Sequence, residues 1–179
     1  MIPTFDYTEM GFDKILLTAD LHFGHEEVRS ACKRPWANVD KMDKGLLSRM
    51  RSVVGPRDLL IVVGDLTMAG PTRADYVEQI IGKMPGTKVL VFGNHDRFKP
   101  QWYLDRGFSL AATALVLPGG VLVVHDPAAA TVWPKDRPVL CGHVHDLFRT
   151  LGNVVNVGVD VWDWAPITLN NAVGLAAER

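Results

Sequence analysis

Three short apolar runs in the first half of the chain constrain the fold more than any other feature. The runs are KILLTAD (14–20), DLLIVVGD (58–65) and TKVLVFGN (87–94), and each ends in a polar residue near a glycine. Each run is too short and too evenly apolar for an amphipathic helix, and such runs are typical of strands that are buried on both faces. We therefore expect three strands of one sheet.

Helical patterns separate these runs. Apolar residues recur at helical spacing from Val39 to Val54, and Asn38 precedes them as the expected N-cap. Residues 72–82 predict a second, shorter helix that Gly82 closes. The resulting order of strand, helix, strand, helix and strand predicts a parallel sheet with helices on its faces.

The second half of the chain has a different pattern. A Pro-Gly-Gly turn joins two apolar runs into a predicted hairpin, two later segments are typical of strands, and a short helix is expected from Asn170. In chain order, the strand segments are SLAATALVL (109–117), VLVVHD (121–126), PVLCGH (138–143) and LFRTLGNVVNVGV (147–159). Two βαβ-like units followed mostly by sheet predict an α/β sandwich rather than a simple doubly wound fold.

Composition limits the class of protein. A chain of 179 residues with 47% hydrophobic content fits one domain over residues 1–179, without a cap domain. The formal net charge of −1 provides no global basic field to recruit long nucleic acids or anionic membranes. No apolar run approaches the ~18 residues of a membrane span, so we expect a cytoplasmic protein. Cys32 and Cys141 match no zinc spacing and are expected to be small buried residues.

Polar residues with metal-binding chemistry gather where the predicted strands end. They are Asp20, His22, Asp65, Asn94, His95, Asp96, His125, His143 and His145, and all six histidines of the chain fall in such segments. Ligands bind at the carboxyl ends of strands in open α/β sheets, so these residues can converge although they are distant in sequence. Taken singly, a pair such as Gly-Asp or Gly-Asn is more often a turn. The ordered conjunction predicts a metal site.

The chemistry of this set favours two divalent ions. Carboxylate, imidazole and carboxamide without thiolate suit Mn, Fe, Zn or Ni, and we expect Mn. A single site takes about four to six ligands, so seven candidates divide naturally over two ions that share one Asp. Two metal ions ~3.5–4 Å apart are typical of phosphoryl transfer. The residues therefore indicate hydrolysis of a phosphate ester.

Five short motifs also resemble a known family. DLH (20–22), GD (64–65), GNHD (93–96), VHD (124–126) and GHVH (142–145) match, in order, the motifs of calcineurin-like metallophosphoesterases. The match runs from Lys14 to about Asp160 and looks more narrowly like small phosphoesterases of bacteria and phages. The resemblance implies an αββα sandwich, with two mixed sheets flanked by helices, around a two-metal centre.

The resemblance also implies a role for each motif residue. Asp20, His22 and His145 would bind the first metal ion, and Asn94, His125 and His143 would bind the second. Asp65 would bridge the two ions. His95 would be the proton donor or a phosphate-binding residue, and Asp96 would orient His95 and keep it protonated.

Other residues are weaker candidates for substrate contacts. His25 follows the first motif and is not part of the family pattern, but it is expected near the metals. Arg34 and Arg97 could hold phosphate through bidentate contacts, although an exposed arginine is the more ordinary interpretation. Trp36, Trp162 and Trp164 could stack on a flat leaving group, although aromatic side chains more often fill cores.

The predicted function is hydrolysis of small phosphate esters by attack of a water that bridges the metal ions. The preferred substrates are phosphodiesters such as cyclic nucleotides. A phosphomonoesterase remains the main alternative. A nuclease would want a basic groove; the near-neutral net charge argues against long polymers but leaves a short end or a modified terminus open. A non-catalytic metal-binding scaffold would be expected to lose ligands, and none of the seven is missing.

Overall fold

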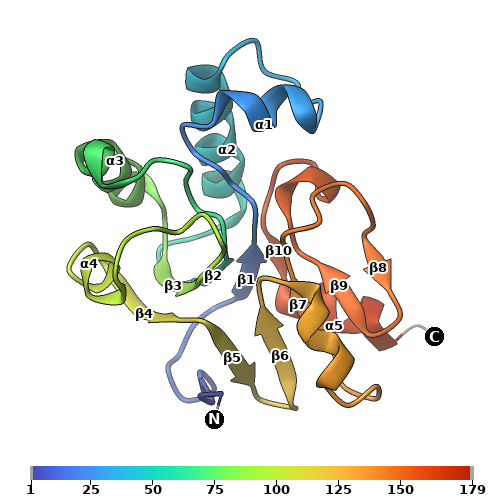
Figure 1. Ribbon diagram of the computed structural model, residues 1–179. Helices are drawn as coiled ribbons and strands as arrows, with labels where there is room; N and C mark the ends of the chain where they lie inside the picture. The colour runs from blue at the N-terminus through green and yellow to red at the C-terminus, as the bar shows by residue number, and fades with distance from the viewer. Residues whose placement is uncertain (1, 178–179) are drawn as a thin grey trace.

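The apolar runs of the first half form one sheet in the computed structural model, which describes residues 2–177 (Figure 1). Its strands are β1 (Ile15–Thr18), β2 (Leu59–Val63), β3 (Thr87–Val91), β4 (Phe108–Ala112) and β10 (Ile167–Thr168), in the order β10-β1-β2-β3-β4. The four strands from β1 to β4 are parallel, and β10 pairs with β1 in the antiparallel sense. The three predicted strands are confirmed as neighbours, at the centre of this sheet.

Five further strands, all from the second half of the chain, form a second sheet. They are β5 (Ala114–Leu117), β6 (Val121–Val124), β7 (Val139–Cys141), β8 (Thr150–Leu151) and β9 (Val154–Asn156), in the order β5-β6-β7-β9-β8. The predicted hairpin is present as the antiparallel pair of β5 and β6. The prediction of one strand over 109–117 is wrong, because the chain passes at Thr113 from β4 in the first sheet to β5 in the second. The apolar run contains no glycine or proline to mark that crossing.

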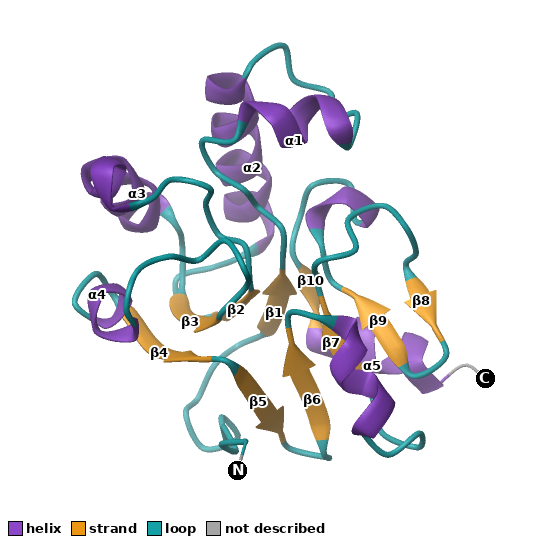
Figure 2. Ribbon diagram, viewed as in Figure 1, coloured by secondary structure: helices purple, strands orange, loops and turns teal. Residues whose placement is uncertain are grey.

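The helices flank the sheets (Figure 2). They are α1 (Glu26–Ala31), α2 (Val39–Val53), α3 (Ala74–Lys83), α4 (Pro100–Leu104) and α5 (Leu169–Ala177), with 3₁₀ turns at Pro71–Arg73, Pro127–Val132 and Val159–Val161. The Asn38 side chain accepts the Lys41 N–H at 3.0 Å, which confirms it as the N-cap of α2. Gly82 does not close α3 but lies inside it, and the helix ends before Met84.

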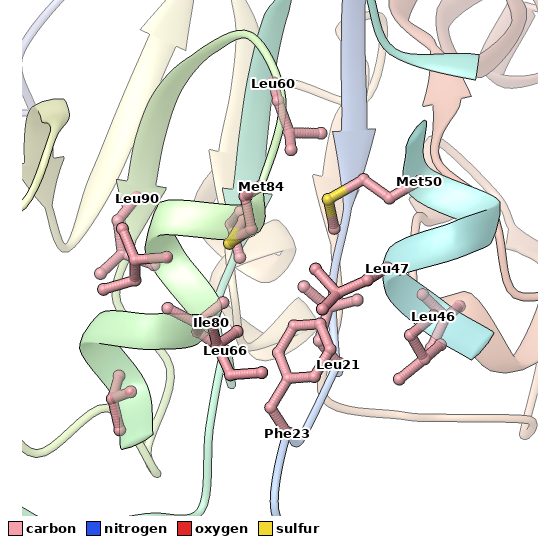
Figure 3. Close-up of a cluster of buried hydrophobic side chains, with 14 of the residues drawn as sticks. Leu21, Phe23, Leu46, Leu47, Met50, Leu60, Leu66, Ile80, Met84 and Leu90 are labelled. Carbon is pink, nitrogen blue, oxygen red and sulfur yellow. The ribbon is translucent and has the colours of Figure 1, made fainter. Parts of the chain in front are cut away.

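Two apolar layers hold the first sheet between the helices and the second sheet. In β2, Leu60 and Val62 join the cluster beneath α2 and α3, whereas Ile61 and Val63 join the cluster between the sheets. This division follows from the alternation of side chains along a strand. Figure 3 shows the first cluster, where Met50 of α2 and Ile80 of α3 point toward the strands. The α/β sandwich of two mixed sheets flanked by helices is therefore confirmed.

No helix within residues 2–177 is both long enough and apolar enough to cross a lipid bilayer.

Candidate metal centre

The loops that follow the central strands bring the predicted metal ligands to one edge of the sandwich. Figure 2 shows the loops after β1 and β6 leaving the two sheets at the same end. Asp20 follows β1, Asp65 follows β2 and Asn94 follows β3, while His125 follows β6 directly and His143 follows β7. The carboxyl ends of strands from both sheets thus meet here, as expected for an α/β ligand site.

The backbone at this edge adopts conformations that residues other than glycine rarely occupy. Eight non-glycine residues of the described chain have a positive φ angle, and five are predicted ligands: Asp20 (56°), His22 (50°), Asp65 (53°), His143 (73°) and His145 (47°). Each such residue costs about 1–3 kcal/mol and persists where the surrounding structure holds it. Strain of this kind gathers at functional sites, and here it coincides with the predicted ligands.

Glycines precede two of the ligands for a steric reason. A Cβ atom on Gly64 would lie 2.2 Å from Nδ1 of His125, and one on Gly93 would lie 2.2 Å from Oδ1 of Asp65. No side chain fits at either position without displacing a ligand. The Gly-Asp and Gly-Asn pairs of the sequence are therefore close-approach points as well as turns.

Asp65 lies at the centre of the ligands. Its Oδ2 atom is 3.4 Å from Nε2 of His22 on one side and 3.4 Å from Nε2 of His125 on the other. Its Oδ1 atom accepts the His95 backbone N–H at 2.9 Å. Burial acts to raise the pKa of Asp65, but hydrogen bonding to His125 and the charge of that histidine lower it to about 2. The carboxylate is therefore ionised and faces two groups of ligands.

We call the first of these groups, Asp20, His22 and His145, the first half-site. Their ligand atoms lie within 4.8 Å of one another. His22 is only 2% exposed, and neither of its ring nitrogens has a hydrogen-bond partner among the described residues. Burial lowers the pKa of His22 to about 3, which keeps the ring neutral, and burial raises the pKa of Asp20 to about 6.

A buried imidazole without a partner is costly unless something else accepts its lone pair. A divalent cation bound by neutral His22 and by the Asp20 carboxylate would meet that need. The chemistry of the donors therefore fits a metal ion at the first half-site.

His145 is oriented by a neighbouring carboxylate. Its Nδ1 atom lies 2.8 Å from Oδ2 of Asp160, so Nδ1 would keep its proton when a metal ion binds at Nε2. Asp160 is itself buried and paired with Arg34, at 2.8 Å between Nε and Oδ1. The sequence motifs identify neither partnership, because Asp160 follows the last motif in a stretch that has no pattern of its own.

Arg34 corrects one expectation. Its guanidinium is fully buried, and its donors are directed to Asp160 and to the backbone carbonyls of Asp20 and Leu21. No donor is turned to the open side, so the structure does not support a phosphate contact by Arg34.

The expectation that Cys32 is buried is wrong. Cys32 is only partly buried, and its Sγ lies within 4.8 Å of ligand atoms of His145 and Asp160. Cys141 is buried, as expected.

We call Asn94, His125 and His143 the second half-site. Oδ1 of Asn94 lies 3.1 Å from Nε2 of His125 and 3.0 Å from Nδ1 of His143. Nδ1 of His125 donates to the Val63 carbonyl at 2.9 Å, which leaves Nε2 for a metal ion. Burial acts to lower the pKa of His125, but Asp65 raises it to about 9. Asn94 and His143 are exposed, so this group faces solvent.

His95 lies at the rim between the half-sites. Its side chain is 29% exposed, and its Nε2 atom is 3.9 Å from Oδ2 of Asp65. Asp96 does not orient the His95 ring as expected. Its carboxylate instead accepts the backbone N–H groups of Asp65, Leu66 and Gly93 at 2.8–3.0 Å. Asp96 therefore ties the loop after β3 to the loop after β2 and positions Asp65.

The weaker candidates divide. His25 lies at the rim, with its ring centre 5.3 Å from that of His22 and its Nε2 atom 3.4 Å from Oε2 of Glu27. Arg97 is exposed on the loop after β3. The tryptophans are engaged in packing: Trp36 and Trp164 meet edge to face at 5.2 Å, and Nε1 of Trp162 donates to a backbone carbonyl.

Comparison with known proteins finds relatives that match most of this chain. An uncharacterised protein of Methanocaldococcus jannaschii is 26% identical over 93% of both chains. The gene 66 protein of Mycobacterium phage D29 is 31% identical over 83% of this chain and 88% of its own. Among solved structures, a protein of unknown function from Aquifex aeolicus shares the fold, with a TM-score of 0.66 and 23% identity over 90% of this chain and 98% of that chain.

Residues 13–150 match the sequence profile of a family described as calcineurin-like phosphoesterase. That range covers most of the chain and holds all five motifs. The chain therefore belongs to the calcineurin-like phosphoesterase family.

Proposed function

We propose that this protein is a two-metal hydrolase of small phosphate esters, with phosphodiesters such as cyclic nucleotides as the preferred class. Family membership implies metal-dependent hydrolysis of phosphate esters. The observation that carries the finer proposal is the place of Asp65, whose Oδ2 atom lies 3.4 Å from one histidine of each half-site. A carboxylate in that position serves both half-sites and is the natural bridge between two ions.

The residues of the two half-sites would hold the ions, and their mixed imidazole, carboxylate and carboxamide donors are compatible with Mn, which we propose, and with Fe, Zn or Ni. When bound, the two ions would neutralise the phosphate and lower the pKa of a water molecule that attacks phosphorus. The chain itself supplies orientation. Asp96 and the Val63 carbonyl fix Asp65 and His125, so the ligands need little rearrangement to receive the ions.

Two histidines at the rim would complete the chemistry. His95 is close enough to Asp65 to contact a phosphate that sits over the centre, and it would protonate the departing oxygen. His25, in the loop after β1, lies beside His22 and would contact the same phosphate. Arg97, exposed beside His95 in sequence, would add a contact to a longer substrate.

Two features favour a small ester. Asn94 and His143 are exposed, so the second half-site is open rather than enclosed by a cap. The net charge of −1 gives no global positive field that would attract a long polyanion. An open centre of this kind accepts phosphate groups on varied leaving groups.

The first test is hydrolysis of a chromogenic phosphodiester and of the matching monoester by metal-depleted protein to which Mn is returned. We expect Mn-dependent turnover of the diester, and the Asp65→Asn variant, purified identically, controls for contaminating phosphatases. Turnover of the monoester alone would replace the diesterase with a phosphatase. Two bound ions without turnover of either ester would favour the scaffold and contradict the proposal.

Salt dependence separates a small ester from a nucleic acid. Binding to a polymer releases counterions, so activity on single-stranded or double-stranded DNA would fall steeply between 50 and 200 mM salt, by about 10³-fold or more for six phosphate contacts. We expect a nearly flat response with the small diester. Faster turnover of DNA than of the small diester, with a steep salt dependence, would identify a nuclease instead.

A further inference from the structure

A guanidinium–carboxylate pair lies beneath the first half-site. Arg34 follows α1, and Asp160 lies in the 3₁₀ turn Val159–Val161, 126 residues away in sequence. Both side chains are fully buried, and two hydrogen bonds join them, at 2.8 Å from Nε to Oδ1 and 2.9 Å from Nη2 to Oδ2. A bidentate pair of this kind holds both partners in one geometry.

The same guanidinium also holds the turn that carries two ligands. Nη2 donates to the Asp20 carbonyl at 2.6 Å, and Nη1 donates to the Leu21 carbonyl at 3.0 Å. These are the carbonyls of the turn in which Asp20 and His22 have φ angles of 56° and 50°. A left-handed turn directs its backbone carbonyls away from the hydrogen bonds of the sheet, so each buried carbonyl needs a hydrogen-bond donor from elsewhere in the chain. Arg34 supplies the donors for both carbonyls.

Asp160 extends the arrangement to the third ligand. Its Oδ2 atom accepts from Nδ1 of His145 at 2.8 Å, which fixes the ring and directs Nε2 to the half-site. Asp20 and His22 come from the start of the chain and His145 from near its end. Arg34 and Asp160 are therefore the connection through which all three ligands of the first half-site are held.

We propose that Arg34 and Asp160 are positioning residues that assemble the first half-site and set its metal affinity. They affect the second half-site less, through the Asp20 carboxylate, which accepts the His143 backbone N–H at 3.0 Å. This inference rests on the proposed two-metal function. It assigns to Arg34 a role that its sequence context does not suggest. The two residues need not touch substrate, because they act through the ligands.

The test compares the same substitutions in two ion pairs. Arg34→Lys keeps the charge but cannot form the two parallel bonds and both carbonyl contacts, and Asp160→Asn keeps the shape but loses the charge. The exposed pair of Arg49 and Asp163, 3.1 Å apart, joins α2 to the turn just after Asp160. Arg49→Lys and Asp163→Asn are therefore matched controls.

Metal binding is measured by calorimetric titration of metal-depleted protein with Mn and by electron paramagnetic resonance, which separates coupled ion pairs from single ions. His145→Ala and His143→Ala, each lacking one ligand of one half-site, provide reference spectra. We expect Arg34→Lys and Asp160→Asn to bind Mn about 10–100-fold more weakly at the first half-site. Losses of this size are typical when a carboxylate that orients a metal-bound histidine is replaced. Their spectra should then resemble that of His145→Ala at limiting Mn, and the controls should resemble the parent.

Three outcomes overturn the inference. Parental affinity at both half-sites would show that the pair only supports the fold. Equal weakening of both half-sites would show that its effect is not selective. If the parent protein bound fewer than two ions, the proposed function would fail and this inference would fail with it. If the parent bound two ions and hydrolysed the diester, but the variants bound Mn as tightly as the parent, only this inference would fail. Should Arg34→Lys not fold, the isosteric Asp160→Asn decides.

Discussion

The two half-sites share Asp65 but differ in how the chain surrounds them. At the first, Asp20 and His22 are buried, and the Arg34–Asp160 pair holds the turn and the His145 ring from beneath. At the second, Asn94 and His143 are exposed, and only His125 is buried. The first half-site is built like part of the core, and the second like a surface.

This difference suggests a division of labour within one centre. A buried half-site with neutral His22 and oriented His145 is pre-organised, so an ion bound there loses little energy to rearrangement of its ligands. The exposed half-site leaves room for the phosphate of a substrate beside its ion. We expect the first half-site to bind Mn more tightly and the second to exchange it more readily.

The largest expected effect follows from removing the group that the half-sites share. Asp65→Asn should reduce bound Mn from two ions to fewer than one per chain and reduce diester hydrolysis by at least about 100-fold, because both half-sites lose the same charged ligand. Elemental analysis after gel filtration measures the ions. Retention of two ions would refute the bridging position, and loss of one ion alone would assign Asp65 to a single half-site.

His95 tests whether the rim is separate from both half-sites. His95→Ala should retain both ions, because its side chain is not a predicted ligand. Hydrolysis of esters with poor leaving groups should fall by about 10²–10⁴-fold, and hydrolysis of esters with good leaving groups should fall less, because they need no proton. A series of substituted phenyl diesters measures this difference. An equal loss across the series would remove His95 as the proton donor.

The candidate ligands of both half-sites could be picked out from the sequence, but their unequal surroundings could not. Gly-Asp, Gly-Asn-His-Asp and Gly-His-Val-His place chemistry at strand ends, and strand ends meet at one edge. The role of Asp160 depends on a contact across 126 residues, which no local pattern records. Arg34 reads as an exposed arginine beside a Pro-Trp pair, and only the fold shows that it is buried beneath the left-handed turn of Asp20 and His22.

The fold shows the same limit. The buried strands were predictable because both of their faces are apolar, and α2 because its apolar spacing and Asn38 cap agree. The crossing at Thr113 was not predictable, because a strand that continues and one that changes sheets have the same local composition. The short helices α1 and α4 have only five or six residues, too few for a period to appear.

Proton release shows whether each half-site loads through one protonated histidine. Without metal, burial acts to lower the pKa of His145, but Asp160 raises it to about 10, and the pKa of His125 is about 9. Both rings are therefore charged at pH 7.5 and must lose a proton to bind an ion, whereas His22 is already neutral. Loading both half-sites should release about two protons, and each affinity should weaken about tenfold for each pH unit below 9.

Calorimetry at pH 7.5 in buffers that differ in ionisation enthalpy measures the released protons as a slope. His145→Ala and His125→Ala should each reduce the slope by about one proton. A binding enthalpy that does not depend on the buffer would show that both rings are neutral before the ions arrive.

The smallest expected effect is on stability, and it compares the half-sites most directly. At a Mn concentration of about 100 times the dissociation constant, an ion that binds only the folded chain adds about 2.7 kcal/mol to the free energy of unfolding. For a chain of this size that raises Tm by about 5–10 °C. The tighter half-site contributes more at any one concentration, so His145→Ala should lose most of the Mn-dependent rise and His143→Ala should keep most of it.

These two histidines lie two residues apart on one loop and receive the same substitution, so a difference between the variants reports the half-sites themselves. Equal losses of the Mn-dependent rise in Tm would show that the first half-site binds Mn no more tightly than the second, despite its burial and the Arg34–Asp160 pair. The two half-sites would then differ in geometry but not in metal affinity.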